Sequence, residues 1–300
     1  YLAAAGSGSL MLEMNIGSVT IPAGMLANIE GSEAQISISR IDASSLPAGV
    51  QAIIGNRPVI RINLAVDGKQ TAWNNPAAPV TVSIPYTPTA EELAHPECII
   101  IWYIDGSGNL ICVPDGHYDT ATGTVTFSTS HFSDYAVGFN IVQFKDVPED
   151  AWYYKAVSFI AARGITNGTG NGNFSPEASL KRADFLVLLL RTYGIEPEAK
   201  PTANFADAGN TYYTGYLAKA RTLGMASGVG NNLFAPEQPI TRQEMFALLY
   251  KTLKAINRLP AAETGKTLAA YADSGDIAKW AKDVTAQLVE AGIINSSDGR

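Results

Sequence analysis

The chain has 300 residues, and its hydrophobic content of 46% is enough for folded cores and predicts two domains. Acidic residues outnumber basic ones by 28 to 21, and the resulting net charge of −7 argues against nucleic-acid binding. The sequence contains no continuous apolar run of the length that crosses a bilayer, so we expect no membrane insertion.

The first half of the sequence is typical of β structure. Short apolar or alternating runs recur, and turn sequences such as Asp67-Gly68 and Thr122-Gly123 separate them. The predicted strands cover residues 35–39, 59–64, 80–84, 98–104, 110–113, 124–128 and 135–139. Many short strands of this spacing predict an antiparallel β-sandwich domain over residues 1–142.

The two cysteines, Cys98 and Cys112, flank a predicted hairpin whose turn is rich in Gly and Asn. If Ile104 lies opposite Leu110, then Cys112 faces Trp102, and the two sulfur atoms are too far apart to bond. We therefore expect two free, buried thiols rather than a disulfide.

After residue 142 the apolar spacing changes to that of helices. Residues 151–163 carry apolar and aromatic side chains at helical spacing, with Asp150 as the predicted N-cap and Gly164 as the residue that ends the helix. A loop rich in Gly and Asn follows, and a second helix is predicted over residues 183–193. The unit is therefore a helix, a glycine loop and another helix.

This unit recurs, and the repeat is the most informative feature of the sequence. Each copy begins with an aromatic-x-Asp motif, has a Trp or Tyr twelve residues before the glycine that ends the first helix, and has Ile or Met directly after that glycine. The first two copies continue with Phe-x-Pro and with an Arg-x-acidic motif at the start of the second helix. The predicted repeats cover residues 143–200, 201–262 and an incomplete 263–300.

These motifs, in this order, resemble the S-layer homology family over about residues 144–300. The resemblance implies an all-α helical bundle, so the predicted fold class is α+β multidomain, with the β-sandwich first and the repeat bundle second. It also implies an extracellular bacterial protein of the cell wall or S-layer. The implied role is non-covalent anchoring through secondary cell-wall polysaccharide, a peptidoglycan-linked glycan that often carries pyruvate ketals.

No cofactor and no enzymatic activity are expected from this resemblance. The third copy stops before any Phe-x-Pro or Arg-x-acidic motif, which puts a third binding groove in doubt. We expect that its second helix was removed or is supplied by another segment or another chain. Self-association in a surface lattice is the structural alternative for the function.

The resemblance directs attention to the start of each second helix. Thr241 and Glu244 form a predicted capping box, which puts Arg242 in the first helical turn. A cation at this end of a helix is locally unfavourable, so its presence indicates that an anion is expected there. The planar fork of arginine suits a carboxylate, and Arg182 is the matching residue of the first copy.

The other predicted ligand residues are aromatic rings that stack on sugars, glycines that admit a sugar to the backbone, and aspartates beside them. They are Trp152, Tyr212, Trp280, Gly168, Gly228, Asp146 and Asp207. Each has an alternative role: the rings as core residues, the glycines as turn residues, the aspartates as caps or loop braces, and the arginines as solvated residues or partners of internal ion pairs.

A second hypothesis concerns His131-Phe132-Ser133, which resembles the cleavage site of self-processing β-sandwich domains. In that chemistry the Ser133 hydroxyl would attack the Phe132 carbonyl, with His131 as the base. The alternative is that His131 and Ser133 are ordinary residues at the end of a strand. The three histidines of the chain show no metal-ligand spacing, so no metal site is predicted.

Overall fold

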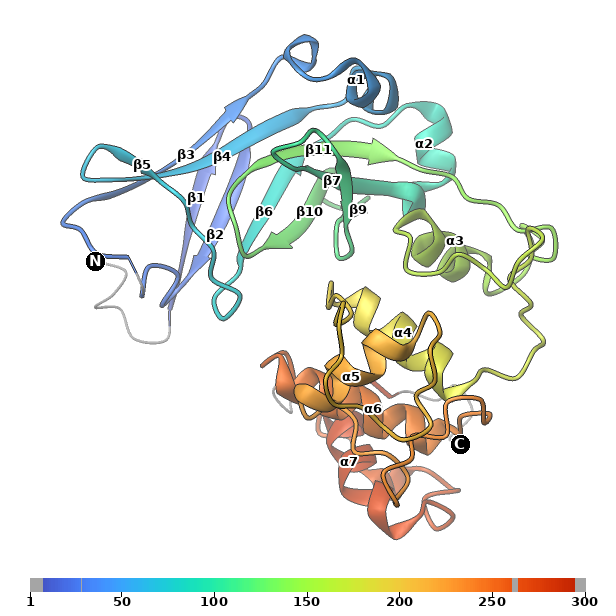
Figure 1. Cartoon of the computed structure of the whole chain (residues 1–300). Coiled ribbons are helices and arrows are strands. Elements are labelled where there is room, and N and C mark those ends of the chain that lie inside the picture. The colour runs from blue at the N-terminus through green and yellow to red at the C-terminus, as the bar shows by residue number, and fades with distance from the viewer. Residues whose placement is uncertain (1–7, 28, 261–263, 295–300) are drawn as a thin grey trace. The chain divides into compact units, whose positions relative to one another are not determined.

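The computed structural model describes residues 8–27, 29–260 and 264–294 (Figure 1). The chain divides into two compact units, Tyr1–Pro176 and Glu177–Arg300. The first contains antiparallel sheets and the second contains helices, which confirms the predicted α+β class. The arrangement as a sandwich followed by a separate helical bundle stays a prediction, because the first unit also includes the first half of the first repeat.

The first unit contains two antiparallel sheets. The five-stranded sheet has the order β1-β2-β6-β10-β9, and the other has the order β3-β4-β11-β7-β8 with β5 paired to β4. The strands are β1 Ser9–Met14, β2 Gly17–Pro22, β3 Ala34–Arg40, β4 Val59–Val66, β5 Lys69–Thr71, β6 Val80–Pro85, β7 Ile99–Ile104, β8 Leu110–Val113, β9 His117–Asp119, β10 Thr124–Thr129 and β11 Asp134–Phe139. Buried side chains of both sheets form one hydrophobic cluster.

Sequence patterns place most of these strands correctly. In β6 and β10 buried residues alternate with partly exposed ones, as expected for strands with one face in the core. The predicted hairpin register is confirmed: Ile104 pairs with Leu110 and Trp102 pairs with Cys112. Both cysteines are free, with Cys98 buried and Cys112 partly buried.

The strands β7 and β11 are buried on both faces, because short helices cover the outer side of their sheet. The helices α1 (Ala48–Ile54) and α3 (Tyr154–Ala162) provide this cover. In β7, Ile99 and Ile101 face the main core, whereas Ile100 packs with Cys98 and with Ala162 of α3. The uninterrupted apolar run in this strand is therefore a consequence of burial on two sides.

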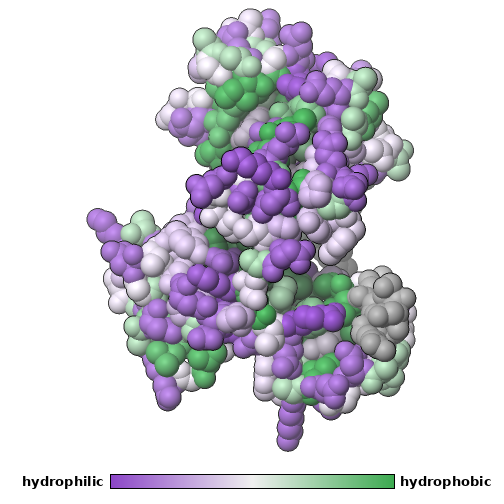
Figure 2. Space-filling model, turned by 90° about the vertical axis from the view of Figure 1, so that its right-hand side faces the viewer, coloured by the Kyte–Doolittle hydropathy of each residue, from purple (hydrophilic) through white to green (hydrophobic). Residues whose placement is uncertain are grey.

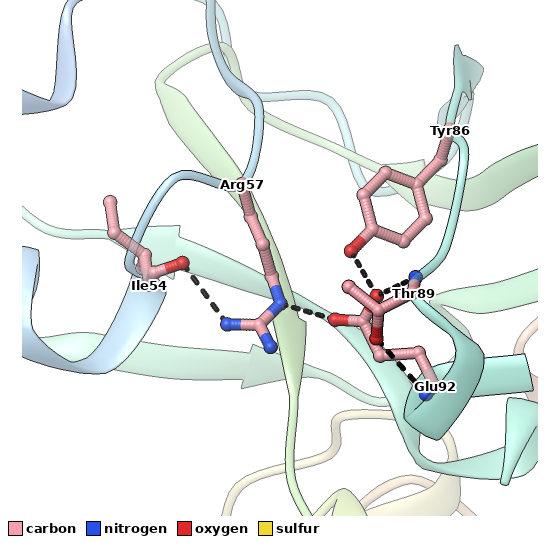
Figure 3. A network of polar contacts seen from close by, with 5 residues as sticks. All are labelled: Ile54, Arg57, Tyr86, Thr89 and Glu92. Carbon is pink, nitrogen blue, oxygen red and sulfur yellow. Dashed lines mark hydrogen bonds and ion pairs between the residues drawn. The ribbon is translucent and has the colours of Figure 1, made fainter. Parts of the chain in front are cut away.

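A buried glutamate joins three segments of the first unit (Figure 3). Glu92, in the helix α2 (Ala90–Ala94), is only 1% exposed. Its carboxylate accepts hydrogen bonds from Arg57 Nε at 2.7 Å, from the Tyr86 hydroxyl at 2.8 Å and from the Thr89 backbone at 2.8 Å. Burial raises the pKa of Glu92, but these three donors outweigh it and lower the pKa below its ordinary value.

The first helix of the repeat region is fastened to the sheets by a buried arginine. Arg163, which follows α3, is 4% exposed and donates to the carbonyl oxygens of Glu97, Ile99 and Gly116. It also covers the ring of Phe159 at 3.4 Å. Burial lowers its pKa to about 10, so the guanidinium stays charged at neutral pH. Charged donors of this kind stabilise α3 on the sheet.

The predicted ends of this helix are partly correct. Gly164 has a positive φ of 66° and lies just beyond α3, as expected of a residue that ends a helix. The predicted N-cap Asp150 is wrong, because α3 begins after Tyr153 and has no side-chain cap. Residues 151–153 form a turn, which places Trp152 ahead of the helix.

The second unit contains four α-helices in its described residues: α4 Arg182–Thr192, α5 Thr214–Thr222, α6 Arg242–Ala255 and α7 Lys279–Glu290. The helix that ends one repeat packs against the helix that begins the next, so α4 contacts α5 and α6 contacts α7. Two hydrophobic clusters fill these contacts. A repeat therefore completes its core with residues of its neighbour.

Apolar side chains also reach the surface. On the face shown in Figure 2 they lie in separate patches among hydrophilic residues. None of the helices in the described parts of the chain has the length and apolar character needed to span a membrane.

The network around Glu92 predicts a pH-dependent contribution to stability. Because the pKa of Glu92 is lowered in the folded state, this contribution is present above the ordinary value of 4.5 and is lost as the pH falls through the lowered pKa. Glu92→Gln should reduce the free energy of unfolding at pH 7 by about 3 kcal/mol. It should also flatten the fall in stability between neutral and acid pH in urea titrations. Exposed Glu91→Gln is the control, and equal pH profiles for the two variants would contradict the assignment.

The Arg163 contacts predict protected thiols. Burial raises the pKa of Cys98 to about 11 and that of Cys112 to about 12, so both should react slowly with iodoacetamide at pH 8. Arg163→Ala removes the hydrogen bonds that hold α3 over Cys98, and labelling should become about tenfold faster or more. Arg61→Ala, which breaks an exposed ion pair with Asp134, is the control. Unchanged labelling of the Arg163 variant would show that α3 is held by other contacts.

Candidate functional site

The two arginines at the helix starts occupy different environments. Arg182 is 6% exposed and lies among residues of the next repeat. Its Nε donates to the Phe234 carbonyl at 2.9 Å, and its Nη1 forms an ion pair with Glu244 Oε1 at 2.8 Å. Its guanidinium also lies 4.9 Å from the centre of the Phe234 ring. The alternative of an internal ion pair is therefore confirmed for Arg182.

The backbone at the start of α4 is also used internally. The N–H groups of Arg182 and Ala183 donate to the carbonyl oxygens of Gln238 and Pro236. The free N–H groups of a helix start are the ones that bind anions, and here these two are satisfied by the protein itself. This helix end is therefore a contact between repeats.

Arg242 is exposed at the start of α6. The predicted capping box is present, and Glu244 Oε2 accepts from the Thr241 backbone at 2.9 Å. Among the described residues, the contact of the Arg242 guanidinium is with the Phe246 ring, 5.9 Å from its centre. Arg242 also lines a pocket of about 340 Å³ between α6 and the third repeat. Its lining residues are Thr241, Arg242, Gln243, Phe246, Leu268, Tyr271, Asp273, Asp276, Ile277, Thr285, Val289 and Ile294.

The three equivalent aromatic residues are all exposed. The exposed fraction is 93% for Trp152, 62% for Tyr212 and 58% for Trp280. The alternative in which these rings belong to the core is therefore wrong. In the first two repeats the core position is occupied by the next residue along the chain. Tyr153 packs with the cluster around Val157, and Tyr213 is 5% exposed.

The predicted aspartates brace their own loops. Asp146 accepts hydrogen bonds from the N–H groups of Phe174 and Ser175, and Asp207 accepts from those of Phe234 and Ala235. The distances lie between 2.7 and 2.8 Å. Ser175 and Ala235 have positive φ angles of 63° and 59°, a conformation that non-glycine residues rarely adopt. The brace alternative is confirmed, and the carboxylates hold an unfavourable turn in place.

The predicted glycines are required by the same loops. A Cβ atom on Gly168 would lie 2.3 Å from the Asn173 carbonyl oxygen, and one on Gly228 would lie 2.3 Å from that of Leu233. Both residues have positive φ angles. The turn-residue alternative is therefore confirmed, because these close approaches are to the protein's own backbone.

The residues of the self-cleavage hypothesis do not contact one another through a hydrogen bond in the described chain. His131 Nδ1 lies 3.3 Å from the Tyr135 hydroxyl, and Ser133 Oγ donates to the Ile104 carbonyl at 3.4 Å. Burial lowers the pKa of His131, which keeps its imidazole neutral at neutral pH. Self-cleavage stays a prediction. Within residues 8–27, 29–260 and 264–294, no cluster of His, Cys, Asp and Glu is arranged to hold a metal ion.

Comparison with known proteins identifies the repeats. The family model of the S-layer homology domain matches residues 143–186 and 204–246. These two segments correspond to the repeats in which Arg182 and Arg242 occur. The aromatic-x-Asp, Phe-x-Pro and Arg-x-acidic motifs are thus parts of S-layer homology sequences.

Relatives among curated proteins share the repeat region. The S-layer protein sap of Bacillus anthracis is 31% identical over 155 residues, which cover 50% of this chain and 18% of that protein. The surface-layer 125 kDa protein of Lysinibacillus sphaericus is 32% identical over 124 residues, or 40% of this chain and 10% of that protein. An amylopullulanase of Thermoanaerobacterium thermosulfurigenes is 28% identical over 201 residues, or 67% of this chain and 10% of that protein.

The chain thus spans less than a fifth of the length of these relatives. The amylopullulanase match is longer than the stretch from residue 143 to residue 300, so it includes part of the β region. Together, the repeats and the surface-layer relatives place the chain outside the cell, in the cell wall or S-layer of a bacterium. The coarse role that they indicate is attachment at the cell surface.

Because Arg182 is buried and Arg242 is exposed, replacing them should lower the stability of the protein by different amounts. Arg182→Gln leaves Glu244 and the Phe234 carbonyl without their charged partner, so the free energy of unfolding should fall by about 2–4 kcal/mol. Arg242→Gln, at an exposed position, should change it by about 0.5 kcal/mol or less. Urea unfolding followed by far-ultraviolet circular dichroism measures both. Similar losses in the two variants would show that the two helix starts are equally buried in solution.

Proposed function

Because residues 143–186 and 204–246 are S-layer homology repeats, we propose that this chain attaches a bacterial surface protein non-covalently to the cell wall by binding secondary cell-wall polysaccharide. The role is one of binding, without a catalysed reaction. It extends the surface attachment indicated by the repeats to a particular class of ligand, a peptidoglycan-linked glycan.

The observation that supports this proposal is the exposure of the same aromatic position in all three repeats. A tryptophan that is 93% exposed has no role in the core, and the equivalent Tyr212 and Trp280 are also more than half exposed. Large exposed apolar groups at related positions mark interaction surfaces. Aromatic rings offer a flat apolar face for a sugar ring, with a polar group at the edge for its hydroxyls.

The Tyr212 ring is additionally held in place. Its hydroxyl donates to Asp184 Oδ1, and the ring packs edge-on against that of Tyr213, whose centre lies 5.1 Å away. Tyr213 in turn donates to Glu237, which pairs with Lys181. A ring with few rotamers to lose on binding is suited to stacking, because less conformational entropy opposes complex formation.

The pyruvate ketals proposed on the polysaccharide would present carboxylates. Of the two arginines considered for them, Arg182 is already bonded to Phe234 and Glu244, whereas the guanidinium of Arg242 is exposed. The glycan proposal therefore rests on the three aromatic residues, and Arg242 is the member of the arginine pair that a carboxylate can reach.

Removal of the three rings should weaken wall attachment. The triple variant Trp152→Ala, Tyr212→Ala, Trp280→Ala should bind purified cell-wall sacculi at least about tenfold more weakly in a cosedimentation assay. The matched control is Met11→Ala, which removes an apolar side chain of 57% exposure from the first unit. Circular dichroism should show that all variants are folded.

Two further results bear on the ligand. Sacculi from which acid has stripped the pyruvylated polymer should no longer retain the unaltered chain. Retention of the triple variant at unaltered affinity would contradict the stacking role, and retention by stripped sacculi would exclude this polymer as the ligand.

A further inference from the structure

The first helix of the first repeat has a different packing partner from its equivalents. In the second and third repeats the first helix contacts the helix that ends the preceding repeat, since α5 contacts α4 and α7 contacts α6. The segment that precedes the first repeat is β structure, and α3 packs there, with Ala162 against Cys98 and Ile100. The sheets therefore take the place that a preceding repeat has for α5 and α7.

The side chain that attaches α3 to the sheets is particular to the first copy. Arg163 donates to three backbone carbonyls of the first unit. The aligned residues of the second and third repeats are Leu223 and Ala291, whose side chains carry no donor. From the other side, Asn140, which follows β11, donates through Nδ2 to the Ala162 carbonyl at 2.7 Å.

This attachment also fixes the backbone that carries Trp152. The N–H group of Tyr154, at the start of α3, donates to the Ala151 carbonyl at 2.9 Å and closes the turn that contains Trp152. Tyr153 belongs to the hydrophobic cluster to which α3 contributes, and its ring lies edge-on to the Trp152 ring with the centres 5.5 Å apart. The position of the exposed Trp152 ring is therefore set by the first unit.

The Tyr212 ring is held by residues of the second unit. Its hydroxyl donates to Asp184 in α4, and its ring packs against that of Tyr213, which is buried in the cluster that α4 and α5 share. The exposed rings of the two complete repeats thus lie in different compact units, which the chain joins between Pro176 and Glu177.

We propose that the chain binds the wall polysaccharide at two separate sites, one around Trp152 on the first unit and one around Tyr212 on the second. The inference rests on the proposed stacking role of these rings. The partner is then a polymer long enough to occupy both units at once. After one site has bound, the other meets the same polymer molecule at a high effective concentration, so the complex is far tighter than either site alone provides. The first unit is thereby part of the anchor.

Fragments of the purified wall polysaccharide, separated by length, distinguish two sites from one. Isothermal titration calorimetry with the full chain measures both the affinity and the number of fragments bound. On the longest fragments Trp152→Ala should weaken binding about tenfold or more, because the polymer can no longer bridge the units. On fragments of a single repeating unit, the same variant should lower the number bound per chain and leave the affinity of the remaining binding unchanged. Tyr212→Ala should show the same dependence on length.

Ile53→Ala is the matched control, because it removes an apolar side chain of 56% exposure from the first unit. It should leave binding unchanged at every length. An equal loss of affinity on long and short fragments in the ring variants would show a single site and overturn the inference. Unweakened binding of the longest fragments by Trp152→Ala would overturn it as well. If the unaltered chain retained neither fragments nor sacculi, the proposed function itself would fail.

The attachment of α3 gives a second test, in which Arg163 acts as a positioning residue. Arg163→Ala releases α3 from the sheets, so it should weaken binding of the longest fragments about as much as Trp152→Ala does. Combining the two changes should weaken binding no further, since both act through the same site. Asn140→Ala, which removes a single donor to α3, is the milder variant and should cause a smaller loss.

Two measurements check that these variants are folded. Circular dichroism reports on the sheets, and binding of the shortest fragments at the Tyr212 site reports on the second unit. Losses that add up in the double variant, or full binding of the longest fragments by Arg163→Ala, would overturn the role of the sheets in positioning the Trp152 ring.

Discussion

The contact between Arg182 and the loop of the following repeat is the interaction on which the helical unit depends. One guanidinium bonds a carbonyl, pairs with a carboxylate and covers an aromatic ring, and all three partners come from the next repeat. Since α4 and α5 share a hydrophobic cluster around Phe234, neither repeat completes its core alone. The same arginine position is therefore buried and bonded at the start of α4, whereas it is exposed at the start of α6.

Local features of the chain could be predicted from sequence, because their causes lie within a few residues. The capping box at Thr241, the glycines that end helices and the pairing of Trp102 with Cys112 all follow from short-range geometry. The docking of Arg163 could not be predicted, because Glu97, Ile99 and Gly116 lie 47 to 66 residues away and offer only backbone carbonyls. Every residue has a backbone carbonyl, so the residue types do not reveal which carbonyls accept these hydrogen bonds.

The candidate site illustrates the same limit. Helical spacing favoured the alternative in which the repeated aromatic residues belong to the core. In the first copy, however, the helix starts after Tyr153, so Trp152 lies outside the periodic segment and is exposed. The aspartates and glycines of the loops act on neighbouring backbone, as their residue types allow. The pocket at Arg242 required knowledge of which repeat elements are adjacent, since its lining comes from α6, from α7 and from the segment around Tyr271.

The packing of α3 on the sheets has a consequence for anyone who would use these repeats as a surface-display tag. A fusion that began at residue 143, where the sequence repeat begins, would separate α3 from Cys98 and Ile100 and leave the charge of Arg163 without its carbonyl cradle. A fusion that began at Glu177 would instead follow the division between the two compact units. In this chain the borders of sequence homology and the borders of packing fall at different residues, so a tag that retains Trp152 together with a packed α3 must include the first unit as well.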